Sequence, residues 1–209
     1  MANAQSFTRD EERRLFSTIR KFKDLEAQRD LNWMLLMRHT ARRVETVHLL
    51  DIDEAADAIE RGYMNIASHK QKGGKQGNAK GLNKAQEIYL VDQAKRALQE
   101  LLRIRRQMIK RLGAEDVSPA LILSRRGQRM SIRTYQQRMT HWCNEAKIVK
   151  ASPHWLRHTW AYRRLQNATT GEALRQVQEV LGHEHITTTQ VYTKPSRDDL
   201  VNAMQEAAQ

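Results

Sequence analysis

A basic, glycine-rich segment interrupts an otherwise helical sequence pattern. Positions 70–84 read KQKGGKQGNAKGLNK, with four glycines, five lysines and no acidic residue. The flanking stretches 63–69 (YMNIASH) and 85–90 (AQEIYL) have the composition of short strands, and Gly-Gly and Gly-Asn favour turns. These positions therefore predict one β-hairpin with a long basic loop.

Apolar residues at helical spacing predict helices along most of the remaining chain. Thr8 and Glu11 form a capping-box pattern ahead of the first helix, and Gly182 is placed to end another. Further helices are expected near 26–39, 42–50, 91–112, 132–146, 153–166, 172–181 and 197–206. The predicted fold class is mainly α with a small antiparallel β-sheet (α+β).

The charge balance indicates a polyanionic partner. The 209 residues carry 36 Lys and Arg against 24 Asp and Glu, a net charge of +12, and 40% are apolar, as in a folded globular protein. Membrane association is disfavoured because no apolar run approaches the ~18 residues of a transmembrane helix. The N-terminus lacks the apolar core of a secretory signal, and the single cysteine, Cys143, suits a reducing cytoplasm. Nucleic acid is the favoured partner.

Residues 153–159 (PHWLRHT) could bind a phosphate. Pro153 suits the first turn of a helix, on which His154 and Arg157 share one face. A guanidinium is costly to bury unpaired, but it can bind phosphate through two nitrogens, with the histidine as a second donor. A surface arginine in an ion pair is the competing interpretation.

Tyr192 is a candidate nucleophile. It lies nine residues after His183, which follows Gly182 at a predicted helix end. Cations that converge on a phosphodiester could polarise the phosphorus and favour the phenolate. The alternative is a packing aromatic whose hydroxyl is hydrogen-bonded.

A metal site is another interpretation of the histidines. His154 and His158 are spaced like two helical ligands, and His183 and His185 lie downstream. However, the segment lacks the glutamate that a metalloprotease helix carries next to its first histidine, the chain has no second cysteine, and Arg157 would repel a divalent cation. We therefore expect no metal and no cofactor.

These motifs resemble those of the tyrosine recombinases, the phage integrase family. Residues 154–159 (HWLRHT) resemble the family's H-x-L-R-H box, and residues 181–193 (LGHEHITTTQVYT) resemble its tail with the nucleophilic tyrosine. Residues 40–46 (TARRVET) and the following LDI are similar to its first box, T-G-x-R-x-x-E. Ala41 replaces the usual glycine there, and Thr46 stands where an acid is usual.

The resemblance implies a catalytic mechanism. Tyr192 would attack the scissile phosphorus of DNA, giving a 3′-phosphotyrosyl link and a free 5′-hydroxyl without metal or ATP. Arg43 and Arg157 would bind the non-bridging oxygens, and His154 and His183 would donate hydrogen bonds or assist proton transfer. A hairpin lysine would protonate the leaving oxygen: Lys72 is the expected residue and Lys80 the alternate.

The resemblance also implies partners and domain organisation. Double-stranded DNA is the expected partner, and the expected DNA-binding residues are Lys70, Lys75, Lys84, Arg103, Arg106 and Lys110. We expect one catalytic domain over residues 1–209, with a core at 6–195, no N-terminal core-binding domain, and a location in bacterial cytoplasm at the nucleoid. The helix within 196–209 would exchange between protomers on DNA, or else pack on its own domain.

Two other functions remain open at this level. A type IB topoisomerase uses a similar set of residues to relax DNA. A non-catalytic DNA-binding protein could be built on the same fold, although binding alone would not require the tyrosine. Formation of a covalent adduct with nicked DNA distinguishes an enzyme from a binder.

Overall fold

The computed structural model describes residues 5–67, 86–113, 116–167, 172–183, 189–193, 195 and 197–207. The elements in chain order are α1 (Arg9–Arg20), α2 (Leu25–Thr40), α3 (Val44–His48), α4 (Ile52–Arg61), β1 (Tyr63–Ile66), β2 (Gln86–Tyr89), α5 (Asp92–Leu112), α6 (Ile132–Glu145), α7 (His154–Gln166), α8 (Ala173–Leu181), η2 (Gln190–Thr193) and α10 (Arg197–Glu206). The expected mainly α fold with a small sheet is confirmed.

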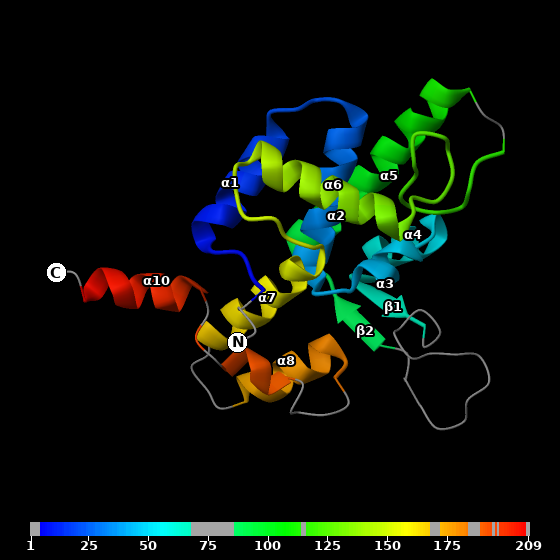
Figure 1. Ribbon diagram of the computed structural model, residues 1–209. Coiled ribbons are helices and arrows are strands. Elements are labelled where there is room, and N and C mark those ends of the chain that lie inside the picture. The colour runs from blue at the N-terminus through cyan, green and yellow to red at the C-terminus, as the bar shows by residue number, and fades with distance from the viewer. Residues whose placement is uncertain are drawn as a thin grey trace.

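Helix α2 lies at the centre of the molecule, where α1, α5, α6 and α7 surround it (Figure 1). It is buried on nearly all sides, as expected of a helix with apolar residues around its circumference. Its Asp30 carboxylate is fully buried and accepts hydrogen bonds from Arg29, Trp33, Arg138 and Trp142. These donors offset the cost of burying the charge and tie α6 to α2.

Local signals explain where most helices begin and end. The Thr8 side chain accepts from the Glu11 backbone, and the Glu11 side chain accepts from the Thr8 backbone, which confirms the predicted capping box of α1. A second capping box, from Asp51 and Glu54, starts α4. Helix α4 was not predicted, since its sequence IDEAADAIER buries mainly two small alanines, Ala55 and Ala58.

The two strands form one antiparallel pair. Met64 pairs with Ile88 and Ile66 with Gln86, so Met64, Ile66 and Ile88 enter the core from one face. This confirms the strands predicted around the basic segment. The predicted loop between them, which includes residues 70–84, lies outside the described residues.

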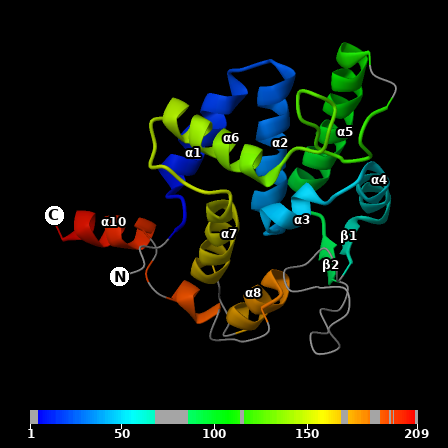
Figure 2. The ribbon, with the colours of Figure 1, turned by 45° about the vertical axis from the view of Figure 1, so that its right-hand side comes forward.

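Helices α7 and α8, with η2, form the lower part of the molecule, and the strands lie beside them (Figure 1). A small apolar cluster packs α7, α8 and η2 against one another, and it contains Ala161, Tyr162, Val177, Leu181 and Tyr192. Helix α10 projects away from the body in both views (Figure 2), and its Leu200, Val201 and Met204 side chains are exposed.

In the part of the chain that the structure describes, every helix is too short or too polar to cross a lipid bilayer.

Candidate active site

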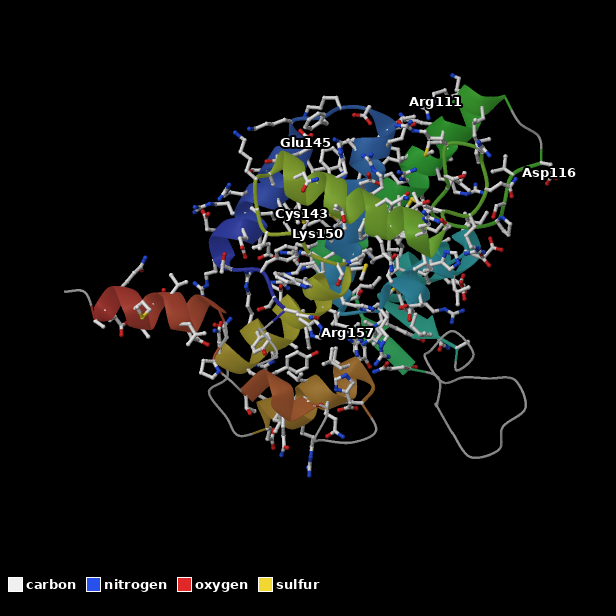
Figure 3. All side chains as sticks on the ribbon, viewed as in Figure 1. Arg111, Asp116, Cys143, Glu145, Lys150 and Arg157 are labelled. Carbon is white, nitrogen blue, oxygen red and sulfur yellow. The ribbon has the colours of Figure 1, made fainter. Side chains whose placement is uncertain are left out.

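Arg157 is the central charged group of the site. It lies on α7 and is only 4% exposed. Its guanidinium donates to the Ala41 carbonyl oxygen at 2.7 Å and to the Leu181 carbonyl oxygen at 2.6 Å. These two hydrogen bonds offset part of the free-energy cost of burying the guanidinium charge. Figure 3 labels Arg157 in the lower half of the molecule, between the α7–α8 part and the strands.

The two carbonyls that hold Arg157 lie at helix ends: Ala41 is itself left-handed, and Leu181 directly precedes the left-handed Gly182. Ala41 ends α2 with φ 54°, and Gly182 ends α8 with φ 63°. Glycine adopts this conformation without the steric cost that an L side chain meets. The left-handed backbone at Ala41 would suit glycine, the residue that the first box of the resembling family leads one to expect here.

His183 is held rigidly by the end of α8. Its backbone N–H donates to the Gln178 carbonyl and the Gly182 N–H donates to Glu179, which is a Schellman pair. The ring nitrogen Nε2 lies 3.3 Å from Arg157 Nη2, and Nδ1 lies 2.9 Å from Thr189 Oγ1. Because arginine can only donate, Nε2 accepts and Nδ1 carries the proton that it donates to Thr189.

Tyr192 is buried against three other rings. It lies on η2 and is 4% exposed. Its ring centroid is 5.2 Å from that of Tyr162, 5.4 Å from that of His158 and 6.4 Å from that of His183, which is nearly parallel to it. The Tyr192 hydroxyl lies 2.6 Å from His158 Nδ1. The ring of Tyr192 is therefore packed in the cluster, and its hydroxyl is within hydrogen-bonding distance of a histidine.

Burial sets the ionisation of these groups. Desolvation raises the pKa of Tyr192 to about 12, although Arg157 and Arg43 act to lower it. Desolvation lowers the pKa of Arg157 to about 9, with Arg43 and Arg42 acting in the same direction. It also lowers the pKa of His183 to about 4, helped by Arg157 and Arg43. At neutral pH the tyrosine and this histidine are uncharged, while Arg157 is a cation.

Arg43 and His154 border this cluster. Arg43 is half-buried at the start of α3, and its charge acts on Arg157, His183 and Tyr192. His154 is the first residue of α7, and its charge acts on His158. Glu45 weakly opposes the lowering of the Arg157 pKa that desolvation, Arg43 and Arg42 cause, so an acid one place early in the first box still acts on this arginine.

Two residues of the site were not assigned by sequence reasoning. His158 is the second histidine of the H-x-L-R-H box, and its two sequence signals were this box and its helical spacing from His154. Arg42 is buried and donates to the Thr40 carbonyl, to the Gln86 side chain and to the Val180 carbonyl. It joins α2, β2 and α8, and its pKa is lowered to about 10 by desolvation and by Arg43.

The predicted hairpin lysines cannot be compared with this geometry. Lys72, Lys80 and the expected DNA-binding Lys70, Lys75 and Lys84 lie outside the described residues.

The expected DNA-binding residues of α5 are exposed. Arg103 is paired with Glu100 at 2.7 Å and with Gln107 at 3.1 Å. Arg106 and Lys110 are also exposed. The end of α5 that carries Arg111 lies far from Arg157 in Figure 3. A contact of Arg103, Arg106 and Lys110 with DNA therefore stays a prediction, separate from the site itself.

Within the described ranges, no group of three or more His, Cys, Asp and Glu side chains is arranged to hold a metal ion. The donors around Tyr192 are instead guanidinium and imidazole groups. This set is suited to binding an anion.

The chain belongs to the phage integrase family, whose model matches residues 5–198. Tyrosine recombinase XerC of Herpetosiphon aurantiacus is 33% identical over 182 residues, which are 87% of this chain and 53% of that protein. XerC of Vibrio cholerae serotype O1 is 38% identical over 112 residues, which are 53% of this chain and 33% of that protein. The chain thus spans about half the length or less of these relatives.

Solved structures show the same fold. The crystal structure of XerA recombinase matches with a TM-score of 0.70 at 23% identity, over 97% of this chain and 64% of that one. The Tn1549 transposon integrase, in complex with transposon right end DNA, matches with a TM-score of 0.74 at 19% identity, over 99% of this chain and 67% of that one. The described helices and the strand pair are therefore the fold of a tyrosine recombinase catalytic domain.

Proposed function

We propose that this chain is the catalytic part of a site-specific DNA recombinase that cleaves and rejoins DNA through a phosphotyrosyl intermediate. One observation carries the proposal: the Tyr192 hydroxyl lies in a buried cluster with Arg157 and His183, on a fold shared with DNA-bound recombinases. A tyrosine kept only for packing needs neither the arginine nor the oriented imidazole.

The cluster can stabilise the charge of a phosphoryl transition state. Arg157 is fixed by two carbonyl oxygens, so little reorganisation is needed when a scissile phosphate arrives. Arg43 adds a second cation from α3. His183, with Nδ1–H turned to Thr189, holds the Arg157 fork in place. A lysine of the hairpin, Lys72 or Lys80, would protonate the leaving 5′-oxygen.

The expected reaction is transesterification. The Tyr192 oxygen forms a bond to the scissile phosphorus, and the bond from phosphorus to the 5′-oxygen breaks. The new 3′-phosphotyrosyl link conserves the bond energy, so rejoining to another 5′-hydroxyl needs no nucleotide triphosphate. Assembly of protomers on DNA through α10, whose apolar side chains are exposed, belongs to the same proposal.

A nicked suicide duplex tests the proposal. The wild-type protein should form a covalent adduct that survives a denaturing gel, and Tyr192→Phe should form none while it keeps its DNA affinity. Tyr162→Phe is the matched control, since Tyr162 packs on Tyr192 from the same cluster. A duplex shift on a native gel with no adduct from the wild-type protein would indicate a DNA-binding protein without this activity.

Strand exchange between two duplexes then separates a recombinase from a topoisomerase. A protein that relaxes supercoiled DNA as a monomer but never joins one duplex to another would contradict recombination.

A further inference from the structure

The Tyr192 hydroxyl has a close partner that the motif-based assignment left out. His158 Nδ1 lies 2.6 Å from the Tyr192 oxygen, and the two ring centroids lie 5.4 Å apart. This is the normal length of a strong hydrogen bond that involves a hydroxyl group. His158 sits one turn after His154 on α7, so the helix delivers it directly to the tyrosine of η2.

His183 is poorly placed for the same contact. Its Nε2 faces Arg157 and its Nδ1 donates to Thr189, so both ring nitrogens are engaged. Its ring lies nearly parallel to that of Tyr192, at 11°, and the two ring centroids are 6.4 Å apart, against 5.4 Å for His158 and Tyr192. His183 therefore orients Arg157, whereas His158 is the histidine that lies within hydrogen-bonding distance of the phenol oxygen.

We propose that His158 Nδ1 accepts the phenol proton of Tyr192 when this tyrosine attacks the scissile phosphorus. The inference rests on the proposed function and adds a catalytic residue to it. In the attack step the proton moves from Oη to Nδ1, Oη bonds to phosphorus, and the bond from phosphorus to the 5′-oxygen breaks. That oxygen takes a proton from the hairpin lysine. In the rejoining step the incoming 5′-hydroxyl gives its proton to the hairpin lysine and its oxygen bonds to phosphorus. The bond from phosphorus to Oη breaks, and the His158 imidazolium returns its proton to the departing phenol oxygen.

The electrostatics of the cluster hold the proton on Tyr192 in the resting state. Desolvation, His154 and Arg157 lower the pKa of His158 to about 4, so the ring is neutral and its Nδ1 is free to accept. The pKa of about 12 at Tyr192 keeps its proton on the oxygen in the resting state. The transfer becomes favourable only as the oxygen bonds to phosphorus, because a phenol bonded to phosphorus is far more acidic. The nucleophile is thus protected until DNA is bound.

The charged and titratable groups that face His158 come from three segments. His154 and Arg157 lie on its own helix, Tyr192 lies on η2, and His183 follows α8. The three nearby imidazoles would titrate together, so a pH profile alone cannot assign an acid limb to His158. Chemical rescue can, since it acts at one vacated position.

Variants of His158 on the suicide duplex test the proposal. His158→Ala should slow adduct formation by about 10²- to 10⁴-fold, the usual contribution of a general base, without loss of DNA affinity. Free imidazole should raise the rate of adduct formation by His158→Ala at least tenfold, and imidazoles of higher pKa should raise it further. His158→Asn keeps a polar atom near the Nδ1 position but cannot take a proton, so it should remain slow. His141→Ala on α6 is the matched control, because His141 is exposed and outside the cluster.

Three outcomes overturn the inference. The first is that His158→Asn forms the adduct as fast as the wild type. The second is that the rate of His158→Ala lies within threefold of the wild-type rate. The third is that imidazole does not raise the rate of a folded His158→Ala protein. A wild-type protein that forms no adduct contradicts the proposed function instead.

The tautomer of His158 gives a readout that needs no activity. Nitrogen NMR of the free protein should show Nδ1 unprotonated and Nε2 carrying the proton. A protonated Nδ1 would overturn the inference whether or not the protein cleaves DNA.

Discussion

The guanidinium of Arg157 donates to the carbonyl oxygen of Ala41, a residue in left-handed conformation at φ 54°. The charge that a phosphate would meet is thus positioned by a backbone turn that ends α2. The same arginine reaches the end of α8 through Leu181, so one side chain joins two helix ends to α7. The position of the Arg157 guanidinium therefore depends on how α2, α7 and α8 pack together.

The left-handed Ala41 predicts a mild response to glycine. Ala41→Gly removes a buried methyl worth ~0.8 kcal/mol but relieves a left-handed strain of ~1–2 kcal/mol, so unfolding free energy should change by less than about 1 kcal/mol. Ala97→Gly is the matched control: Ala97 is also buried, but it lies inside α5. It should cost about 2 kcal/mol, since glycine weakens a helix interior by ~1 kcal/mol. Denaturant unfolding measures both, and equal losses would contradict the strain at Ala41.

The buried carboxylate of Asp30 should be essential to the core. Asp30→Ala leaves the Trp33 and Trp142 indole N–H groups and the Arg29 guanidinium without their acceptor, and should cost ~3–5 kcal/mol of stability. Asp57→Ala removes an exposed ion pair with Arg61 on α4 and should cost less than about 1 kcal/mol. Thermal and denaturant unfolding of both variants measure the difference. A small loss at Asp30 would show that the core repacks without the carboxylate.

Arg157→Ala should reduce the rate of covalent adduct formation by roughly two to three decades, because removal of one preorganised donor at a developing oxyanion costs ~3–4 kcal/mol. Arg13→Ala on α1 is the control, since Arg13 is exposed and paired only locally with Asp10. Circular dichroism checks that the variant is folded, because two carbonyl oxygens lose their donor. A loss below tenfold would place Arg157 outside the chemistry.

The leaving-group lysine can be identified chemically. Lys72→Ala should slow cleavage of an ordinary duplex but not of one with a 5′-bridging phosphorothiolate, whose sulfur leaves without a proton. Lys80→Ala is the matched variant in the same loop and should be nearly unaffected on both duplexes. If the sulfur substrate rescues Lys80→Ala instead, the alternate lysine is the general acid.

Helix α10 should support assembly on DNA. Its Met204 is 74% exposed, and Leu200 and Val201 are exposed beside it. These three apolar side chains are too few to overcome the entropy lost on association, and we therefore expect the free protein to be a monomer. On a duplex with two binding sites, deletion of residues 196–209 or Met204→Ser should remove cooperative binding and spare single-site binding. Val149→Ser is the control, because Val149 is another exposed apolar residue, and this variant should keep cooperative binding. If the protein without residues 196–209 still binds cooperatively, α10 is not needed for contact between protomers.

The sequence determined the helices with clear periodic patterns, because their apolar spacing and end signals are local. The capping box at Thr8, the glycine stop at Gly182 and the strands around the basic segment were all predicted at nearly their observed bounds. Helix α4 was missed since two alanines make a weak apolar pattern, even though Asp51 and Glu54 carry a start signal.

The sequence motifs also brought Arg157, His183 and Tyr192 to attention, and the fold does place them together. Which groups touch was decided only in three dimensions. Arg42 and Arg43 are neighbours in the chain, yet Arg42 is hydrogen-bonded to the end of α8, while the charge of Arg43 acts on Arg157, His183 and Tyr192. Likewise, His154 and His158 share a helix face, but only the packing of η2 on α7 decides that His158 meets the tyrosine. Local patterns encode elements, whereas contacts between distant elements depend on how those elements pack.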